Sequence, residues 1–495
     1  MDDYRLKQPP SLDKSSGSEV VPAREADAPP LVVGPTTRLL DPHRPTWLLV
    51  LALAWPTLLQ QLLVFAVNMF DGLMAGRFQD VTGAEQIASQ AAQTTANYLA
   101  WFLSTSAMLV SVGATAVVAR LLGAGDRRTA VHAANQAIVL AVALGAGGAV
   151  FGWLGLSSIL GALHLSGEEA ELAAAFLRPM FGLLAFQMVE LVGLACLVGA
   201  GDTRTGMFVL GGVALVNMPL TWLFFHGMGP IPALGFAGIG TGTAVAHTLG
   251  GLAVLAVLAH GRAGLRLHPR LIAPNPELMW RLLRISVPAG MDSLSLTLGQ
   301  LWFLGMVNQA LGDVDQAAHG IAIRWEALSY LTGQAFGTAA MALVGQNLGA
   351  RRPEQAGRSG WTAYALGGSW MACMGAVFYM LAPEMFGLFC PKPEQAPIIT
   401  AGVPVLRLVA LAQPALAATN IFAASLRGAG DTRVPVLITW IGFFGCRIPL
   451  AYLLMQSEFH LGLVGAWTAM FIDLYVRGLL ILGRFASGRW KRLRV

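Results

Sequence analysis

The sequence predicts an all-α integral membrane protein of about twelve transmembrane helices in two six-helix lobes. Apolar residues make up 55% of the 495 residues and charged residues only 12%, whereas about 25% of a soluble domain is charged. Apolar runs of about 20 residues, long enough to cross a hydrocarbon core of about 30 Å, follow one another from Thr46 onward. The hexapeptide GAGDTR occurs twice, about 230 residues apart.

The apolar runs give the expected spans in chain order. They lie near 46–72, 88–112, 131–155, 172–198, 206–226, 236–260, 280–306, 318–345, 359–383, 401–425, 434–455 and 464–486. The residues before them are polar and Pro-rich and have no apolar core of a signal peptide. We therefore expect a disordered cytoplasmic tail (1–45), an N-lobe (46–260), a cytoplasmic linker (261–279), a C-lobe (280–486) and a basic cytoplasmic tail (487–495).

The two halves of the chain repeat. Alignment on GAGDTR also aligns LGFAGIGT with LGLVGAWT, and GATAVVARLLGAGD with GTAAMALVGQNLGARR. Because each half holds six spans, both halves enter the membrane from the same side, related by a pseudo-two-fold axis along the membrane normal. We expect GAGDTR to be a turn in which glycine ends one helix and Asp202 or Asp431 caps the next.

The distribution of arginine predicts the orientation. The loops after even-numbered spans contain Arg120, Arg127, Arg128, Arg204, Arg262, Arg266, Arg270, Arg351, Arg352, Arg358, Arg427 and Arg433. By the positive-inside rule these loops and both termini are cytoplasmic, which predicts a multi-pass protein of the inner (plasma) membrane. This bias explains the net charge of +5, so nucleic acid is not expected as a partner. The four cysteines form no CxxC pair and predict neither a disulfide framework nor a zinc site.

The sequence resembles the multidrug and toxic compound extrusion (MATE) transporters over essentially the whole chain after the tail. The resemblance is carried by LVGQNLGARRPEQA, the paired GAGDTR turns, WPTLLQQLLVFAVNMFDGLMAGR, and NMPLTWLFFHG followed by ALGFAGIGTGTAVA, the last most like the bacterial NorM-type branch. It implies an antiporter that exports bulky, often cationic and lipophilic compounds in exchange for H⁺ or Na⁺ by rocking of the two lobes. We expect a monomer in the lipid bilayer, with no cofactor and no catalytic residue.

Ionisable groups inside spans indicate function, because each costs several kcal/mol to place in hydrocarbon. Asp71, in NMFDGLMAG, matches the family's N-lobe coupling aspartate, and the resemblance places the oxygens of Asn217 and Thr243 beside it. Some branches carry a second aspartate where this chain has Thr221. These four residues are the expected ion-coupling site of the N-lobe.

The expected coupling residue of the C-lobe is Asp292, which follows Pro288 by one turn and lies near the middle of its span. Na⁺ at Asp71 or Asp292 is the one metal that we expect. Asp473 and Arg477, at i and i+4, are expected to neutralise each other, whereas Glu190 and His247 are expected to pack within the N-lobe. The candidate residues of the substrate cleft are Gln60, Asn68, Gln300, Trp302 and Glu326.

Two other functions compete with efflux: a flippase for lipid-linked precursors, built on a related two-lobe fold, and a membrane-embedded enzyme. The sequence contains no cluster of His, Cys, Asp or Glu with catalytic spacing, and no P-loop for ATP-driven pumping. A flippase of large anionic head groups would line its cavity with Arg or Lys, whereas the cleft candidates here are acidic or neutral. The sequence therefore favours the export of organic cations.

Overall fold

The computed structural model describes residues 44–493, apart from 77–95, 97–98, 163–166 and 457–460. The described residues are helices joined by short turns, with two isolated β-bridges and no β-strand. The expectation of an all-α membrane protein is confirmed. The N-terminal tail lies outside the described residues except for its last two positions.

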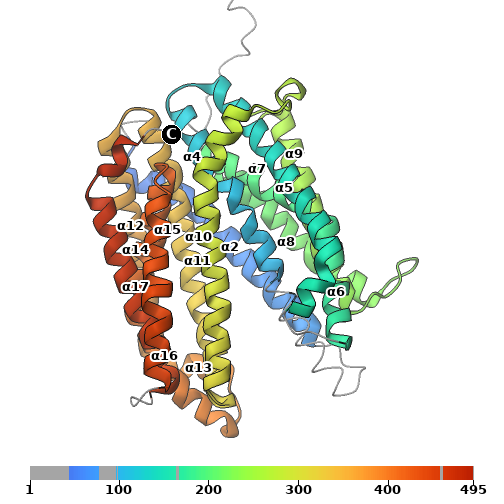
Figure 1. The fold of residues 1–495 in the computed structure, drawn as a ribbon, viewed down its shortest axis with the longest axis vertical. Coiled ribbons are helices and arrows are strands. Elements are labelled where there is room, and N and C mark those ends of the chain that lie inside the picture. The colour runs from blue at the N-terminus through green and yellow to red at the C-terminus, as the bar shows by residue number, and fades with distance from the viewer. Residues whose placement is uncertain (1–43, 77–95, 97–98, 163–166, 457–460, 494–495) are drawn as a thin grey trace, which may run out of the picture. The chain divides into compact units, whose positions relative to one another are not determined.

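The helices follow one another in two sets (Figure 1). The N-lobe contains α2 (Thr46–Gly76), α4 (Met108–Gly123), α5 (Arg127–Ala162), α6 (Gly167–Gly182), α7 (Leu184–Gly199), α8 (Thr203–His226) and α9 (Phe236–His260). The C-lobe contains α10 (Pro276–Ala310), α11 (Asp313–Gly349), α12 (Pro353–Met380), α13 (Ala382–Gly387), α14 (Ala396–Gly428), α15 (Arg433–Gly442), α16 (Ile448–Gln456) and α17 (Gly462–Ala486). A π-helical turn, η4 (Phe443–Arg447), joins α15 to α16, and a 3₁₀ turn, η5 (Arg489–Arg492), follows α17.

Length and composition alone identify eight spans among the described residues, or nine if α6 and α7, bent by 57°, count as one. The expected spans 280–306, 318–345 and 359–383 coincide with α10, α11 and α12, which are long enough to span but more polar.

The second expected span, 88–112, ends too early, and most of its residues before Leu99 lie outside the described residues. The observed apolar span is Leu99–Gly123, so Arg120 is a helical residue and not a loop residue. The helix accommodates it because its guanidinium donates to the carbonyl oxygens of Ala429 (3.4 Å) and Leu493 (2.5 Å). The remainder of this stretch consists largely of small, buried residues that pack closely against the neighbouring helices.

Four helices end in the same turn. After α4, α7, α11 and α14 the chain passes through one residue with positive φ, and the next N–H reaches a carbonyl five residues earlier at 2.8–2.9 Å, which is a Schellman motif. The residues with positive φ are Gly125 (79°), Gly201 (83°), Arg351 (58°) and Gly430 (85°). The repeated GAGDTR predicted two of these turns, and the structure has two in each lobe. We call the end of the helices that carries them the turn end.

The capping roles expected for the two GAGDTR aspartates are half right. Asp202 caps α8, because its carboxylate accepts the N–H of Thr205 at 3.0 Å, and it also accepts from Arg262 at 2.8 Å. Asp431 makes no such cap at the start of α15, so the second expectation was wrong. Its carboxylate accepts from Arg484, at the end of α17, at 2.8 Å.

Asp126, in the turn after α4, caps the start of α5 as Asp202 caps that of α8. The N–H of Thr129 donates to its carboxylate at 3.1 Å. This backbone bond is the main cause that lowers the pKa of Asp126, with a smaller contribution from the Thr129 hydroxyl. Three of the four turns therefore place an aspartate at the same position, and the fourth has Arg352 there.

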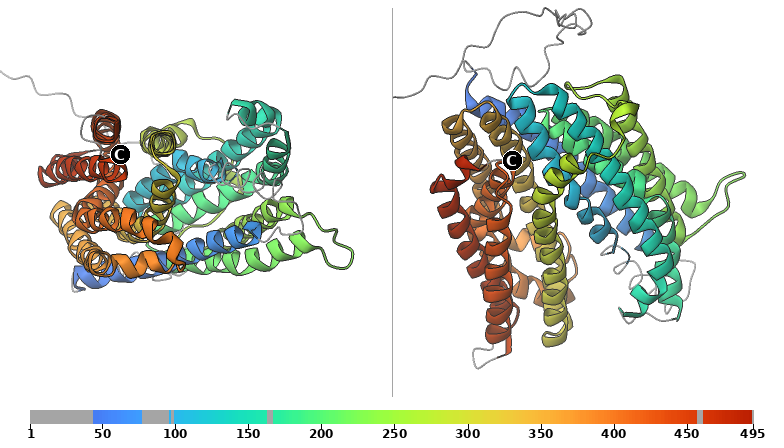
Figure 2. Two further views of the ribbon diagram at one scale, coloured as in Figure 1. Left: turned by 90° about the horizontal axis from the view of Figure 1, so that it is seen from below. Right: turned by 45° about the horizontal axis from the view of Figure 1, so that its top comes forward.

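Each lobe packs the start of its first helix into the core of the other lobe. Leu49 and Leu53 of α2 belong to a buried cluster with residues of α11 and α14, whereas Leu282 and Ile285 of α10 belong to a buried cluster with residues of α4. In Figure 2, α2 (blue) runs from the orange helices of the C-lobe to the green α8. This reciprocal exchange is what a pseudo-two-fold axis between the lobes requires.

The lobes also meet through glycines at the turn end. A Cβ atom on Gly123 of α4 would collide with the carbonyl oxygen of Gln346 on α11, and one on Gly349 of α11 would collide with that of Arg120 on α4. The side-chain amide of Gln346 adds a hydrogen bond to the Gly199 carbonyl oxygen at 2.9 Å.

The hydrogen bonds between lobes extend only part of the way along the helices. They reach from the turn end to Ser286, whose hydroxyl accepts the N–H of Gly113 at 2.6 Å, and to Ser293, which contacts the sulfur of Met108 at 3.6 Å. Beyond Ser293, described residues of α10 bond within the C-lobe, as Ser295 does with Trp440. The ribbons of α6 and α13 diverge toward this opposite end (Figure 1).

Candidate functional site

Three of the residues expected in the N-lobe site come together. Asn217 of α8 donates its amide N–H to the Thr243 hydroxyl of α9 at 3.2 Å, and its amide oxygen accepts from Thr221 at 3.5 Å. Asn217 and Thr221 are buried. The two helices approach closely because Gly242 has no side chain: a Cβ there would lie 2.6 Å from the Thr221 hydroxyl.

Asn68 and Asp71 lie on α2, but their side chains are outside the described residues. The helices α2 and α8 both start at the turn end, and Leu63 of α2 packs against Gly211 of α8, 3.4 Å from where a Cβ would be. From that contact, a rise of 1.5 Å per residue places the backbone of Asp71 about 12 Å further and that of Asn217 about 9 Å further. The backbone of Asp71 is therefore at about the level of the Asn217–Thr221 turn.

A second pair of polar side chains in the N-lobe was not expected to interact. Glu190 of α7 and His247 of α9 face each other, with the carboxylate Oε2 2.7 Å from the imidazole Nδ1. Glu190 is fully buried, and its other oxygen, Oε1, has no hydrogen-bond partner among the described residues. No pattern in the sequence predicted this pair, since 57 residues separate its members.

Asp292, the expected coupling residue of the C-lobe, is paired with an arginine. It is buried on α10, and its Oδ2 accepts from the guanidinium of Arg427, which lies in the last turn of α14 and not in a loop. The other oxygen, Oδ1, has no partner among the described residues. Because a guanidinium does not lose its proton in proteins, the carboxylate has a permanent positive neighbour.

Asp473 lies between two buried arginines. The expected pair with Arg477 is confirmed at 2.7 Å, and Arg447 adds a second bond at 2.8 Å. Arg447 ends the π-helical turn η4, and π-helical turns frequently mark functional sites. Gly442 makes room for the pair, because a side chain there would occupy the space of Asp473 and Arg477.

Glu326, half-buried on α11, is within electrostatic range of Arg447 and Arg477. The acids Asp292, Glu326 and Asp473 thus face the arginines Arg427, Arg447 and Arg477. In the C-lobe each of these carboxylates therefore has a guanidinium in reach, and the cleft candidates chosen from the sequence included no arginine.

The other described cleft candidates lie on α2 and α10. Gln60 lies between α2 and α8, 3.5 Å from where a Cβ on Gly206 would be. On α10, Gln300 is half-buried, and Trp302 is 57% exposed. No hydrogen bond seen in the described parts of these helices joins the four residues.

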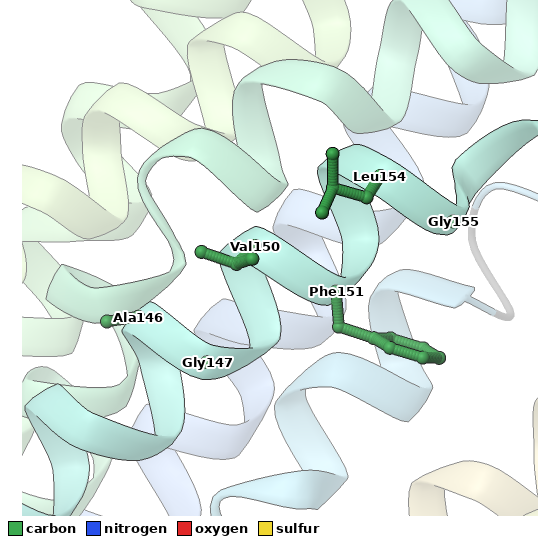
Figure 3. Close-up of a pocket in the computed structure, with 6 residues that line it drawn as sticks. All are labelled: Ala146, Gly147, Val150, Phe151, Leu154 and Gly155. Atoms are coloured by element: carbon green, nitrogen blue, oxygen red, sulfur yellow. The ribbon is translucent and has the colours of Figure 1, made fainter.

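A pocket of about 710 Å³ lies on α5, lined by Ala146, Gly147, Val150, Phe151, Leu154 and Gly155. Figure 3 shows that all six belong to this one helix. Its large side chains are exposed, as in Leu154 at 77%. With an apolar lining, the pocket offers nothing to hold an ion. Across the described ranges, no group of three or more His, Cys, Asp or Glu is arranged to bind a metal.

Comparison with known proteins identifies one family model, which matches once in each lobe, and relatives that match across both lobes. A family model described as MatE matches residues 56–223 and again 288–453. A relative in Mesorhizobium japonicum, named Probable multidrug resistance protein NorM, is 30% identical over 88% of this chain and 92% of its own. Multidrug resistance protein MdtK of Yersinia pestis is 28% identical over 89% of this chain and 94% of its own.

Solved structures share the fold. A crystal structure described as MATE in complex with MaL6 has a TM-score of 0.83 at 19% identity, covering 92% of this chain and 99% of that one. A structure described as the outward-facing conformation of a multidrug resistance MATE family transporter has a TM-score of 0.81 at 19% identity, over 90% of this chain and 97% of its own.

Proposed function

Since the chain belongs to the MATE family of multidrug efflux transporters, we propose that it is an antiporter that exports organic cations in exchange for protons. Members of the family are transporters and not enzymes, and they need no cofactor. The proposal concerns what the family alone leaves open: the coupling ion, the class of compound and the orientation in the membrane.

The observation that supports proton coupling is the buried polar cluster of the N-lobe. Asn217, Thr221 and Thr243 form a chain of hydrogen bonds at about the level of Asp71. A carboxylate in such a site binds either a proton or a monovalent cation, and burial favours the neutral, protonated form. Because Thr221 stands where some branches have a second aspartate, the site has one formal negative charge, which favours H⁺ over Na⁺.

The charge of the two lobes supports cationic substrates. In the C-lobe, three carboxylates are balanced by three arginines. The intramembrane acids of the N-lobe, Asp71 and Glu190, have no described arginine beside them. A lipophilic cation is therefore drawn toward the N-lobe, and proton entry there releases it.

The orientation follows from the arginine-rich turn end, which the positive-inside rule assigns to the cytoplasm together with both termini. The lobes contact each other from this end as far as Ser293. In this orientation the contacts between the lobes lie on the cytoplasmic side, and we infer an outward-open state from them. We infer a monomer, since each lobe finds its counterpart within the chain.

The test is uptake of tetraphenylphosphonium into proteoliposomes under a proton gradient and, separately, under a sodium gradient. We expect the proton gradient to suffice and a protonophore to abolish uptake. Dependence on sodium with none on pH would overturn the proposed coupling ion, and absence of cation transport under both gradients would overturn the proposed substrate class.

A flippase for lipid-linked precursors remains the second candidate because of Arg427, Arg447 and Arg477, which such a protein would use to bind anionic head groups. A related structure from Pyrococcus furiosus, similar with a TM-score of 0.82 at 20% identity over 92% of this chain, is described as having a binding pocket of reverse polarity. A flipping assay with a fluorescent lipid-linked saccharide in the same proteoliposomes distinguishes the two functions.

A further inference from the structure

We propose that Glu190 and His247 form a second proton-binding site of the N-lobe, which sets the pH range over which exchange is coupled. The proposal rests on the proposed proton coupling and extends it to two residues for which neither the family match nor the relatives' names suggest a role. It is carried by the identity of the partner, the burial of the carboxylate and the place of the pair beside the Asn217 cluster.

The partner of Glu190 distinguishes it from other buried carboxylates of the described chain. Asp202, Asp292, Asp431 and Asp473 each bond to an arginine, whereas Glu190 bonds to a histidine. A guanidinium keeps its proton at any physiological pH, but an imidazole gains or loses one between about pH 5 and 8. Among these paired acids, only Glu190 has a partner that can exchange a proton during a transport cycle.

Burial couples the two groups. Glu190 is 0% exposed and His247 24% exposed. Around the free Oε1 the neighbours are apolar: a Cβ on Gly250 would lie 2.5 Å from it and 2.6 Å from Val213. An ionised carboxylate in such surroundings requires a positive partner, so loss of the imidazolium proton favours uptake of a proton by Glu190. The charge of each group therefore depends on the charge of the other.

The contacts between helices give the levels of ionisable groups on the helices packed against the pair. Contacts of Gly193 with Ile138 and of Gly145 with Ala185 bracket the level of Glu190 on α5, which leaves His132 near the turn end. On α8, Arg204 is nine residues before Val213, about 14 Å away. The remaining ionisable residues of the packed helices are Arg120 of α4, Arg127 and Arg128 of α5, Glu168, Glu169, Glu171 and Arg178 of α6, Cys196 of α7, His226 of α8, His260 of α9 and Asp71 of α2, and α11 has none between Tyr330 and Gly349.

The pair is adjacent to the proposed coupling site. His247 follows Thr243 by one turn on the same face of α9, about 6 Å along the axis. Thr243 accepts from Asn217, which in turn bonds Thr221 at about the level of Asp71. A row of polar groups thus leads from the level of Asp71 to Glu190, deeper in the lobe and nearer the turn end. The pair is placed to receive a proton from the coupling site.

The first arm of the test compares Glu190→Gln and His247→Gln with the wild type in proteoliposomes. Uptake driven by a gradient of one pH unit is measured at mean pH values from about 5.5 to 8.5, beside gradient-free exchange of labelled for unlabelled tetraphenylphosphonium. His260→Gln, at the exposed end of α9, is the matched control. We expect His247→Gln to shift the midpoint of the pH profile by about one pH unit, a tenfold change in proton binding. His260→Gln should keep both the wild-type pH profile and the wild-type gradient-free exchange.

The second arm does not depend on transport. Histidine labelled with ¹⁵N in the detergent-solubilised protein gives resonances from which His247→Gln removes one. We expect the chemical shift of that resonance to change with pH. The midpoint of the change should move by about one pH unit in Glu190→Gln and return part of the way in Glu190→Asp. The inference fails if the midpoint of this resonance is the same in Glu190→Gln as in the wild type, or if His247→Gln transports with the pH profile of the wild type. The proposed proton coupling is not affected by either outcome. If the coupled titration is present but no gradient drives transport, the proposed function fails instead.

Discussion

Gly123 and Gly349 occupy equivalent positions in the two lobes, and each lies against the backbone of the helix that carries the other. The pseudo-two-fold axis passes between them, at the end where the lobes are in contact. The same relation joins Gly199 to the backbone of Thr115 within the N-lobe and Gly428 to that of Met341 within the C-lobe. The repeat thus specifies close contacts between helices as well as the order of spans.

Gly123→Ala and Gly349→Ala should each impair transport without preventing either lobe from folding. An added Cβ meets a carbonyl oxygen, which cannot move aside as a flexible side chain does. Overpacking costs about 1–3 kcal/mol, enough to change an equilibrium between two states by roughly 5- to 150-fold. Efflux normalised to folded protein is the measurement. Gly147→Ala, at a position with open space around it, is the control, and equal losses in both would contradict the role of the contact.

Arg351→Gly should stabilise the protein. Three of the four turns have glycine at the left-handed position, and Arg351 adopts φ of 58° there. A non-glycine residue in this region costs about 1–2 kcal/mol, which glycine would relieve. The greater freedom of glycine in the unfolded chain cancels part of this gain in stability. Thermal unfolding in detergent should show a higher midpoint. Ala350→Gly, at φ of −71°, should lower the midpoint, and a loss in both variants would refute the interpretation.

The two GAGDTR aspartates should respond differently to substitution. At Asp202, alanine removes a helix cap worth about 0.5–2 kcal/mol, whereas asparagine retains it. At Asp431, which makes no cap, alanine and asparagine both remove the negative charge that pairs with Arg484, so their midpoints should differ less than those of the two Asp202 variants. Transport per folded molecule should be nearly unchanged in all four variants. Thermal unfolding decides the matter, and indistinguishable midpoints for Asp202→Ala and Asp202→Asn would count against the cap.

Asp473→Asn should cause the largest loss of folded protein among the charge variants. It leaves two buried guanidinium groups, Arg447 and Arg477, without their carboxylate, and removal of one partner from a buried pair costs about 3–5 kcal/mol. Glu354→Gln breaks the pair with Lys491, in which Glu354 is 89% exposed, and should cost no more than about 1 kcal/mol. The fraction of monodisperse protein on gel filtration is the readout. A fully folded Asp473→Asn would show that the arginines find other partners.

Asp71→Asn should leave folded protein in the membrane but abolish gradient-driven efflux, because it keeps shape and hydrogen bonding and removes the charge cycle. Asp292→Asn should also lower the folded yield, since Arg427 loses its partner. Asp292→Asn with Arg427→Gln removes both charges and should restore the yield. If Asp292 couples transport, the double variant stays inactive. Normal efflux there would leave Asp292 a structural role, and normal efflux in Asp71→Asn would remove the basis of the proposed coupling.

The sequence predicted most of the helices because hydrocarbon length and repeat spacing are local properties. It did not predict that the second span extends to Gly123, because an arginine such as Arg120 is typical of a loop. Only the structure shows the carbonyl partners that allow Arg120 to lie in the helix. The pairing of Asp292 with Arg427 and of Glu190 with His247 depends on which helix faces meet. Small-residue contacts decide those faces, and one sequence without its packing does not reveal them.

The bond from Arg120 to the carbonyl of Leu493 joins the second helix of the N-lobe to the end of the chain, which is anchored to the C-lobe by the buried Trp490. When the lobes part at the turn end, this bond must break or the last residues must detach from α17. A fluorescent protein fused shortly after Leu493 would therefore lie next to a contact that changes when the lobes part. The same attachment point makes the carboxy terminus a natural place for a distance label that reports each transport cycle.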